Sequence, residues 1–319
     1  MPDARPVRAI ALMNQKGGVG KTTTAVHIAH ALARAGRPTL LADLDPQAHA
    51  TIHLGIDPDA DHPGVLEVLA RETTVQDAAI DRSENLSVLP AHTDLASIEP
   101  ELAAESDRNH RLRDALADAD GRYEFVIIDC PPSLGLLTLN ALAAAREVVI
   151  PMQPHFLALQ GVSKLLETVR VVQARLNDKL RVLGVAVCMH EPQTTLAQEV
   201  LADLKEFFDA SREQPVPWSR ARVLSPAVRR NVKLAECPSH GQTIFEYAPD
   251  AAGAKDYVAL AATLIAEWDA MLERRGLVDP KPIIAPSLPT PQTTPDEAQP
   301  MPPPHPHPPH QQPTHQQPT

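Results

Sequence analysis

Cysteine is scarce in this sequence of 319 residues. The three cysteines, Cys130, Cys188 and Cys237, are odd in number and widely spaced, and no two of them form a Cys-x-x-Cys pair. This pattern argues against a disulfide framework and predicts a protein of a reducing cytoplasm. The chain is long enough to bury a full core without disulfides or structural metals.

Long apolar runs and an excess of positive charge are also absent. No uninterrupted apolar run approaches the roughly 18 residues that span a bilayer, and the segment Met1 to Pro6 is not an apolar signal region. The sequence therefore predicts a soluble protein. The formal net charge of −11 argues against a uniformly basic nucleic-acid binder, because attraction to phosphate grows with positive charge.

One short segment reverses this acidic balance. Between positions 220 and 233 there are five basic residues and no acidic one, a local charge of +5. These residues are Arg220, Arg222, Arg229, Arg230 and Lys233. In an acidic chain this contrast is informative, although a run of charge is often only a solvated, exposed face.

The composition changes near residue 280. Of the 33 prolines, 15 fall in residues 280–319, together with four of the 14 histidines, and apolar side chains almost vanish after Leu288. Such a segment cannot bury enough apolar area to offset its ordering entropy. We therefore predict a folded domain over residues 1–276 and a disordered tail, rich in Pro, His and Gln, over residues 277–319. We assign no chemistry to the tail.

Before the tail, β-rich apolar runs alternate with helical patterns, which is typical of βαβ units. The predicted strands are Arg8 to Met13, Thr39 to Ala42, Leu86 to Leu89, Phe125 to Asp129, Val148 to Pro151 and Val182 to Cys188. The predicted helices are Lys21 to Ala35, Arg108 to Ala119, Leu136 to Ala145, Leu159 to Leu176, Leu196 to Phe208 and Gly253 to Arg274. We expect an α/β fold with a doubly wound, mostly parallel sheet.

A glycine-rich segment joins the first predicted strand to the first predicted helix. It reads Asn14-Gln15-Lys16-Gly17-Gly18-Val19-Gly20-Lys21-Thr22-Thr23. Glycines allow successive backbone N–H groups to point at one cluster of oxygens, and the helix N-terminus adds partial positive charge. We therefore predict a phosphate-binding loop over Lys16 to Thr23, with Lys21 on the β- and γ-phosphates and Thr22 on Mg²⁺.

The loop departs from the plain G-x-x-x-x-G-K-[ST] form, since Gln15 stands in place of the first glycine and a second lysine, Lys16, follows it. The pattern Lys-Gly-Gly-x-Gly-Lys-Thr resembles that of the ParA and MinD superfamily, the P-loop NTPases with a deviant Walker A motif. The resemblance extends over Ala9 to about Trp268. It implies that Lys16, as a catalytic residue, crosses the interface of an ATP-dependent homodimer to reach the ATP of the other subunit.

Three aspartates follow predicted strands. Asp43 and Asp45 stand at i and i+2 and point the same way, and Asp129 ends an apolar run of four residues. In an open parallel sheet, ligands sit at the carboxyl ends of the strands. The resemblance implies that Asp45, in the family's Asp-x-Asp-Pro-Gln motif, orients or activates the attacking water. It also implies that Asp43 supports the Mg²⁺ shell or the loop, and that Asp129 holds Mg²⁺ through water.

Three further segments resemble the partition branch of the family: Ser133 to Ala145, Ala158 to Gly161 and Arg230 to Glu236. The resemblance implies an ATPase that dimerises on ATP, binds DNA non-specifically and drives chromosome or plasmid partitioning with a ParB-like partner. Such a protein is cytoplasmic and associated with the nucleoid. On this resemblance the candidate DNA contacts are the basic residues of positions 220 to 233, namely Arg220, Arg222, Arg229, Arg230 and Lys233. The alternatives are that these residues are solvated surface or contact the nucleotide.

Three alternatives share this ATPase core. A MinD-like membrane ATPase needs a C-terminal basic amphipathic helix, which the proline-rich segment after Gly276 lacks. An iron–sulfur reductase needs two suitably placed cysteines per subunit, and neither Cys130 nor Cys188 has that spacing. We therefore expect no membrane partner and no iron–sulfur cluster. A ParA-like ATPase that positions a protein cargo or scaffold stays open beside DNA partition.

Overall fold

The computed structural model describes residues 6–119, 121–155 and 158–277. The strands in this part of the chain are β1 (Arg8–Leu12), β2 (Thr39–Asp43), β3 (Ile80–Ser83), β4 (Leu86–Leu89), β5 (Phe125–Asp129), β6 (Glu147–Met152), β7 (Arg181–Val187) and β8 (Arg222–Val223). They form one sheet in the order β3-β4-β2-β5-β1-β6-β7-β8. Every neighbouring pair is parallel except β3 and β4. The predicted α/β fold with a mostly parallel sheet is confirmed.

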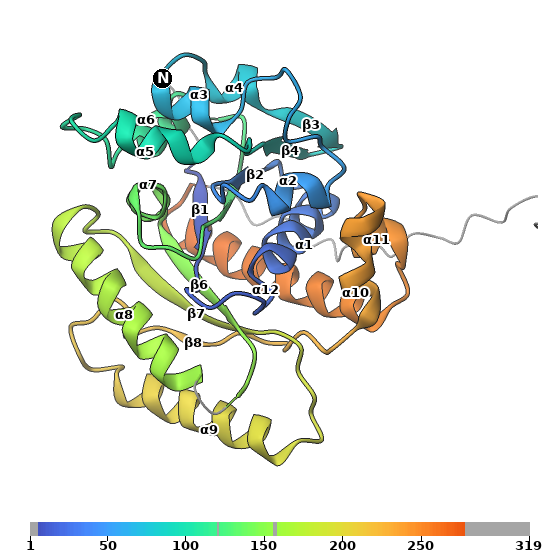
Figure 1. Cartoon of the computed structure of the whole chain (residues 1–319). Helices are drawn as coiled ribbons and strands as arrows, with labels where there is room; N and C mark the ends of the chain where they lie inside the picture. The colour runs from blue at the N-terminus through green and yellow to red at the C-terminus, as the bar shows by residue number, and fades with distance from the viewer. Residues whose placement is uncertain (1–5, 120, 156–157, 278–319) are drawn as a thin grey trace, which may run out of the picture. The chain divides into compact units, whose positions relative to one another are not determined.

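Helices cover both faces of this sheet (Figure 1). The α-helices are α1 (Lys21–Arg34), α2 (His49–His53), α3 (Val65–Ala70), α4 (Val75–Ala78), α5 (Ile98–Glu101), α6 (Arg111–Asp118), α7 (Leu136–Ala144), α8 (Ala158–Arg175), α9 (Thr195–Ala210), α10 (Val232–Glu236), α11 (Ile244–Tyr247) and α12 (Ala252–Arg274). Two short 3-10 helices, η1 (Leu95–Ser97) and η2 (Cys237–His240), complete the elements of the described residues. None of these helices is long and apolar enough to cross a membrane.

Alternate side chains of the central strands enter two separate apolar layers, as the period of two in a β-strand requires. In β1, Ala9 and Ala11 pack on one side with α3 to α9, whereas Ile10 and Leu12 pack on the other side with α1, α11 and α12. All residues of β1, β2 and β5 are buried. These strands therefore read as continuous apolar runs in the sequence, as expected for a parallel sheet covered on both faces.

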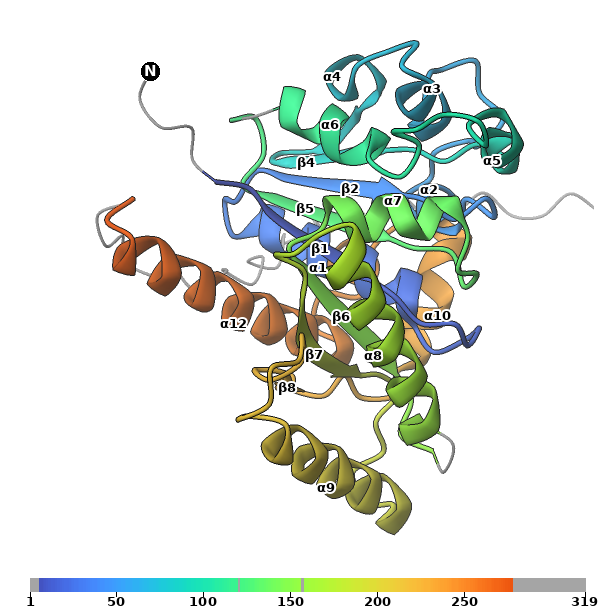
Figure 2. The same cartoon turned by 90° about the vertical axis from the view of Figure 1, so that its left-hand side faces the viewer.

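The parallel register brings distant segments to one edge of the sheet. Asp129 at the end of β5 lies beside Asp43 at the end of β2 and beside Leu12 at the end of β1. Figure 2 shows these strands running in the same direction, with β5 between β2 and β1. The glycine-rich loop, which leaves β1, and the two strand-end aspartates therefore meet at the carboxyl edge.

Each predicted strand and helix corresponds to an element of the structure, with ends that differ by a few residues. The largest shift is in α6, which begins at Arg111 rather than at Arg108. Sequence reasoning also missed β3, β8 and the short helices α2 to α5, α10 and α11. Helices of four to six residues show too little periodicity to be predicted, and β8 has two residues that are defined only by pairing with β7. The predicted tail, residues 277–319, lies outside the described residues except for Leu277.

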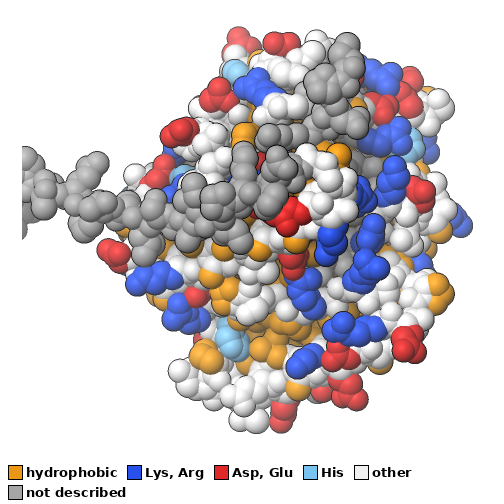
Figure 3. Space-filling model, turned by 180° about the vertical axis from the view of Figure 1, so that it is seen from behind, with side chains coloured by type: hydrophobic (Ala, Val, Ile, Leu, Met, Phe, Trp, Pro, Cys, Tyr) orange, Lys and Arg blue, Asp and Glu red, His pale blue; other side chains and the backbone are white. Residues whose placement is uncertain are grey.

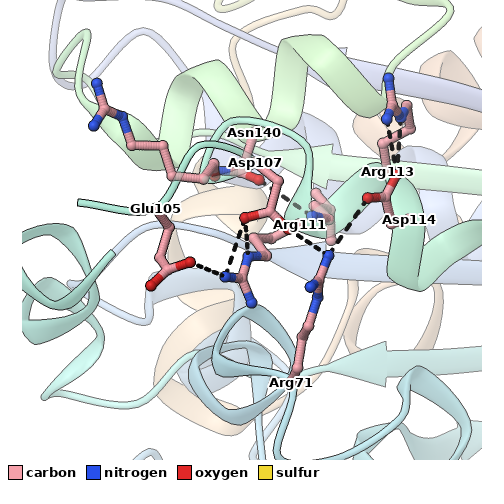
Figure 4. A network of polar contacts seen from close by, with 9 residues as sticks. Arg71, Glu105, Asp107, Arg111, Arg113, Asp114 and Asn140 are labelled. Carbon is pink, nitrogen blue, oxygen red and sulfur yellow. Dashed lines mark hydrogen bonds and ion pairs between the residues drawn. The ribbon is translucent and has the colours of Figure 1, made fainter. Parts of the chain in front are cut away.

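Side chains fix the late start of α6 (Figure 4). The fully buried Asn140 of α7 accepts a hydrogen bond from the backbone N–H of Leu112 at 3.1 Å and donates one to the carbonyl of Arg108 at 2.7 Å. Arg111 forms ion pairs with Asp107 at 3.1 Å and with Glu105 at 3.4 Å. The turn before α6 is thus tied to α7, the helix that follows β5.

We expect Asn140→Ala to lower the free energy of unfolding by about 1–3 kcal/mol, because it leaves the buried N–H of Leu112 without its partner and removes the hydrogen bond to the part-buried carbonyl of Arg108. Denaturant unfolding of the full chain measures this change. Arg113→Ala is the matched control, since the ion pair of Arg113 with Asp114 is exposed and such pairs contribute about 0–1 kcal/mol. Equal stability of the Asn140 variant and the wild type would contradict this role.

Candidate functional site

A cavity of about 460 Å³ opens at the carboxyl edge of the sheet. Its lining includes most of the glycine-rich loop and extends to α2 and η2. The lining residues are Lys16, Gly17, Gly18, Gly20, Lys21, Thr22, Thr23, Asp45, Gln47, His49, Ile52, His53, Pro132 and Pro238. The structure thus brings Asp45 to the predicted phosphate-binding loop. Val19 of the loop is buried and is not part of this lining.

The loop has the backbone conformation that its glycines permit. Gly18 and Gly20 have φ values of 72° and 88°, a left-handed region that favours glycine. At Gly20 a Cβ atom would also lie 3.3 Å from the Cβ of Cys188. Gly20 caps α1, and its carbonyl accepts a hydrogen bond from the Thr24 N–H at 2.9 Å. Only glycine fits this junction without strain.

Asn14 anchors the start of the loop. Its side-chain amide donates to the carbonyl of Pro151 at 2.7 Å, and its Oδ1 accepts from the backbone N–H of Lys16 at 3.0 Å. Pro151 belongs to β6, the strand beside β1. The loop is therefore held between two neighbouring strands.

The two lysines of the loop lie in different environments. Lys21 is buried and its Nζ lies 2.9 Å from Oδ1 of Asp129 and 3.6 Å from Oδ2 of Asp45. Burial lowers the pKa of Lys21, but the two carboxylates outweigh it, so the net shift is upward. Lys16 is directed elsewhere, with its Nζ 2.6 Å from Nε2 of His155 at an exposed contact. The positive charges of one loop are thus kept apart.

Asp43 lies beneath the cavity and is fully hydrogen-bonded. Its Oδ2 accepts from the backbone N–H and the hydroxyl of Thr51, both at 2.9 Å, and its Oδ1 accepts from the N–H of Asp45 at 3.1 Å. Burial, followed by the charge of Asp129, raises the pKa of Asp43 to about 7. These contacts join Asp43 to Thr51 and to the backbone of Asp45, and its role in the Mg²⁺ shell or the loop stays a prediction.

Asp129 and Thr22 have the features of a site for Mg²⁺. Burial raises the pKa of Asp129, against the opposing effects of Lys21 and of the Thr22 side chain. One oxygen of this fully buried carboxylate, Oδ2, has no hydrogen-bond partner among the described residues. Mg²⁺ is usually held by one or two protein oxygens with water and substrate phosphates completing its shell. Thr22 and Asp129 therefore fit this ion.

A second cavity of about 250 Å³ adjoins the first and shares Gly20 and Thr23 with it. Its walls include Met189, Asn231 and Tyr257, which sequence reasoning did not select. Asn231 lies in the segment Arg230 to Glu236, and the resemblance of this segment to the partition branch could have identified it. Met189 and Tyr257 come from separate parts of the chain, and only the fold brings them here.

The five basic residues of positions 220 to 233 do not form one patch. Arg229 and Arg230 line the second cavity, whereas Arg220 and Arg222 line a third cavity among the amino ends of the strands. Arg229 pairs with Asp256 at 2.7 Å, and Lys233 pairs with Glu236 at 2.8 Å. Although these residues are close in sequence, the fold places Arg220 and Arg222 at a different cavity from Arg229 and Arg230. Their contact with DNA stays a prediction.

The three cysteines are buried free thiols. Burial raises the pKa of Cys130 to about 12 and the pKa values of Cys188 and Cys237 to about 11. Each thiol is therefore neutral near pH 7. The absence of an iron–sulfur cluster stays a prediction.

Comparison with known proteins identifies the family. The model of a family described as an AAA domain matches residues 7–182. The sporulation initiation inhibitor protein Soj of Bacillus subtilis is 43% identical over 260 residues, which are 81% of this chain and 98% of Soj. The chromosome-partitioning ATPase Soj of Thermus thermophilus is 45% identical over 260 residues, 82% of this chain and 96% of the relative. The chain belongs to the ParA/Soj family of chromosome-partitioning ATPases.

A solved relative of this ParA/Soj chain carries a nucleotide. It is the cobyrinic acid a,c-diamide synthase of Mycobacterium smegmatis with bound ADP and magnesium, 37% identical, with a TM-score of 0.70, covering 83% of this chain and 97% of the relative. The septum site-determining protein MinD of Pyrococcus horikoshii, 24% identical with a TM-score of 0.62 over 81% of this chain and 96% of MinD, shares the fold. The predicted family, its ATPase class and its ligands ATP and Mg²⁺ are confirmed.

Buried histidines connect α1 of the ParA/Soj domain to α11. Nε2 of His27 accepts from the N–H of Ile244 at 2.9 Å, so Nδ1 carries the proton and donates to the carbonyl of Thr23 at 2.6 Å. The ring stacks on Tyr257 and lies edge-on to His53. Burial lowers the pKa of His27 well below its usual value, and lowers the pKa values of His30 and His53 to about 4.

We expect the stability of the domain to fall as the pH drops from about 6.5 toward 4. In that window the unfolded state binds protons on these histidines and the folded state does not, which costs up to ~1.4 kcal/mol per pH unit for each histidine. Denaturant unfolding at a series of pH values measures the slope. His53→Gln should make it shallower, and His240→Gln, at an exposed position, should leave it unchanged. An unchanged slope in the His53 variant would refute this origin.

Proposed function

We propose that this ParA/Soj family member is an ATP-dependent homodimer that binds DNA non-specifically and partitions a chromosome or plasmid together with a ParB-like protein. The observation that carries the proposal is the separation of Lys16 from Lys21 within one loop. On this proposal the protein works in the cytoplasm, on the nucleoid.

Lys21 already has two carboxylates as partners, whereas Lys16 is at the surface with a neutral imidazole as its neighbour. Two ammonium groups on one phosphate cluster would repel each other. Lys16 is free to swing away from His155 toward a phosphate presented by a second subunit. There it adds a positive charge where negative charge develops during phosphoryl transfer.

The two adjoining cavities have the sizes and linings that a nucleoside triphosphate needs. The cavity of about 460 Å³ has the loop N–H groups and Lys21 for the phosphates. The cavity of about 250 Å³ has the aromatic ring of Tyr257, the thioether of Met189 and the amide of Asn231 for the base. ADP and magnesium in the 37% identical relative support this assignment.

Hydrolysis on this proposal uses Asp45 and the ion site. Mg²⁺, when bound by Thr22 and Asp129, neutralises charge on the phosphate oxygens. Oδ1 of Asp45 accepts from the N–H of Gln47 at 3.1 Å, and its Oδ2 lies 3.6 Å from Lys21. This carboxylate is thereby fixed in the wall of the phosphate cavity, where it can orient the attacking water. Loss of the γ-phosphate then releases Lys16 and the dimer opens.

We expect Lys16→Ala to abolish ATP-dependent dimerisation while ATP binding persists through Lys21. Size-exclusion chromatography with light scattering, with ATP, with ADP and without nucleotide, measures the oligomeric state. Retention on random-sequence duplex DNA, measured in the same three conditions, should require ATP in the wild type and be lost in the variant.

Lys179→Ala is the control, because Lys179 is an exposed lysine in the turn before β7. A Lys16 variant that dimerises on ATP as the wild type does would refute the role of Lys16. A wild-type chain that dimerises on ATP and binds no DNA would refute DNA partition and favour a protein cargo.

We expect Asp45→Ala to trap the ATP dimer, because the nucleotide still binds while the water is no longer oriented. Removing a positioned catalytic carboxylate typically costs about 10²–10⁴-fold in rate. Phosphate release measures the turnover, and chromatography after ATP removal measures how long the dimer persists. Turnover at the wild-type rate would contradict the assignment.

A further inference from the structure

A third cavity, of about 250 Å³, lies at the opposite edge of the sheet from the phosphate loop. Its walls come from the amino ends of β1, β6, β7 and β8 and from the last turns of α12. Figure 3 views this side of the unit and shows Lys and Arg side chains gathered there. The charged residues of the lining are Arg8, Arg146, Arg181, Arg220, Arg222, Arg274, Glu147 and Glu267. None of them belongs to the nucleotide site.

The floor of this cavity is a set of ion pairs. The side chain of Arg8 is nearly buried, and its guanidinium lies 2.7 Å from Glu147 and 3.6 Å from Glu267. It also donates to the carbonyl of Leu264 at 2.5 Å. Glu267 forms a second ion pair, with Arg222. Both glutamates of the cavity are therefore already paired, and the floor holds Arg8 in one position.

Four further arginines of the lining form no hydrogen bond or ion pair with any described residue: Arg146, Arg181, Arg220 and Arg274. Burial, and after it the charges of Arg181 and Arg275, lowers the pKa of Arg146. Six arginines less two glutamates leave a formal charge of +4 on the cavity. Cations held together without counter-charges repel one another, so an anion between them is stabilised.

The wall of the cavity also holds a buried donor without an acceptor. Trp268 is 2% exposed and lines the cavity, and its indole N–H has no hydrogen-bond partner among the described residues. Its ring lies beside the Arg8 guanidinium, with Cζ 5.9 Å from the ring centroid. Buried polar groups normally have a partner. An acceptor bound in this cavity can supply one.

The position of these groups limits the ligand to a small molecule. Arg146 is half-buried and Trp268 is buried, so neither projects from the surface toward a rigid rod such as duplex DNA. A ligand reaches them only by entering the cavity. The volume of about 250 Å³ is below the roughly 300–1,000 Å³ of pockets that enclose a drug-sized ligand.

The chemistry of the lining favours phosphate groups. Every cation of the cavity is an arginine, and the planar guanidinium matches the oxygens of phosphate with two parallel hydrogen bonds. A phosphate monoester carries about −1.5 to −2 charges near pH 7, more than a carboxylate does. Two phosphate groups therefore balance the formal charge of +4.

We propose that this cavity binds a small molecule with two phosphate groups, a bisphosphate or a diphosphate. The inference goes beyond the proposed function and does not depend on it. Arg146 precedes β6, Arg181 begins β7 and Arg274 ends α12. A ligand that contacts all three joins two strands to this helix and removes the repulsion among the arginines. Since a ligand of the folded state stabilises that state, binding raises the midpoint of thermal unfolding.

The test titrates the full chain with inorganic pyrophosphate, in saturating ADP so that the phosphate loop is occupied. The chain has two tryptophans, and Trp218→Phe leaves the fluorescence of Trp268 to report on the cavity. We expect a saturable change with pyrophosphate and none with sodium sulfate at the same ionic strength. In this background Arg146→Ala/Arg181→Ala should bind pyrophosphate at least about tenfold more weakly, because charge-assisted hydrogen bonds are lost.

A second measurement keeps both tryptophans. Pyrophosphate should raise the midpoint of thermal unfolding of the ADP-bound wild type and leave that of the double variant unchanged. Arg113→Ala/Arg170→Ala is the matched control, because it removes two exposed arginines that do not line the cavity. This control should respond to pyrophosphate as the wild type does.

Three results would overturn the inference: no saturable response to pyrophosphate in either measurement, equal affinity in the double variant, or an equal response to sulfate. Weaker binding of duplex DNA by the double variant, without a pyrophosphate response in the wild type, would overturn it as well and assign these arginines to DNA. The oligomeric state of the wild-type chain with ATP decides the proposed function separately.

Discussion

The parallel alignment of β2, β5 and β1 is the constraint on which the site depends. It sets Asp43 beside Asp129, and Asp129 beside the last residue of β1, so that three segments separated along the chain end at one edge. Strand ends in such a sheet leave a crevice in which ligands bind. Gly20, in a left-handed conformation against Cys188, then turns the chain from β1 into α1 without closing that crevice.

The register places two buried carboxylates, those of Asp43 and Asp129, on neighbouring strands. Two buried negative charges side by side are unfavourable without compensation. Lys21 neutralises Asp129, and the hydrogen bonds from Thr51 and from the Asp45 backbone satisfy Asp43. One carboxylate oxygen, Oδ2 of Asp129, is left without a hydrogen-bond partner among the described residues. This oxygen is therefore available to the Mg²⁺ ion that would accompany a bound nucleotide.

The same alignment gathers the amino ends of the strands at the opposite edge. There the chain places arginines in excess of glutamates, so the two edges of one sheet differ in sign: acids beneath a phosphate loop at one, arginines around a cavity at the other.

The sequence by itself determined the sheet, the phosphate loop and the family, because these depend on local patterns: buried apolar runs, glycines at a strand-to-helix junction and acids at strand ends. Only the tertiary structure decided which groups share a surface. It separated Arg220 and Arg222 from Arg229 and Arg230, joined the former to Arg146, Arg181 and Arg274, and brought Met189 and Tyr257 to one cavity. Such groupings depend on strand order and helix packing, which no local pattern encodes.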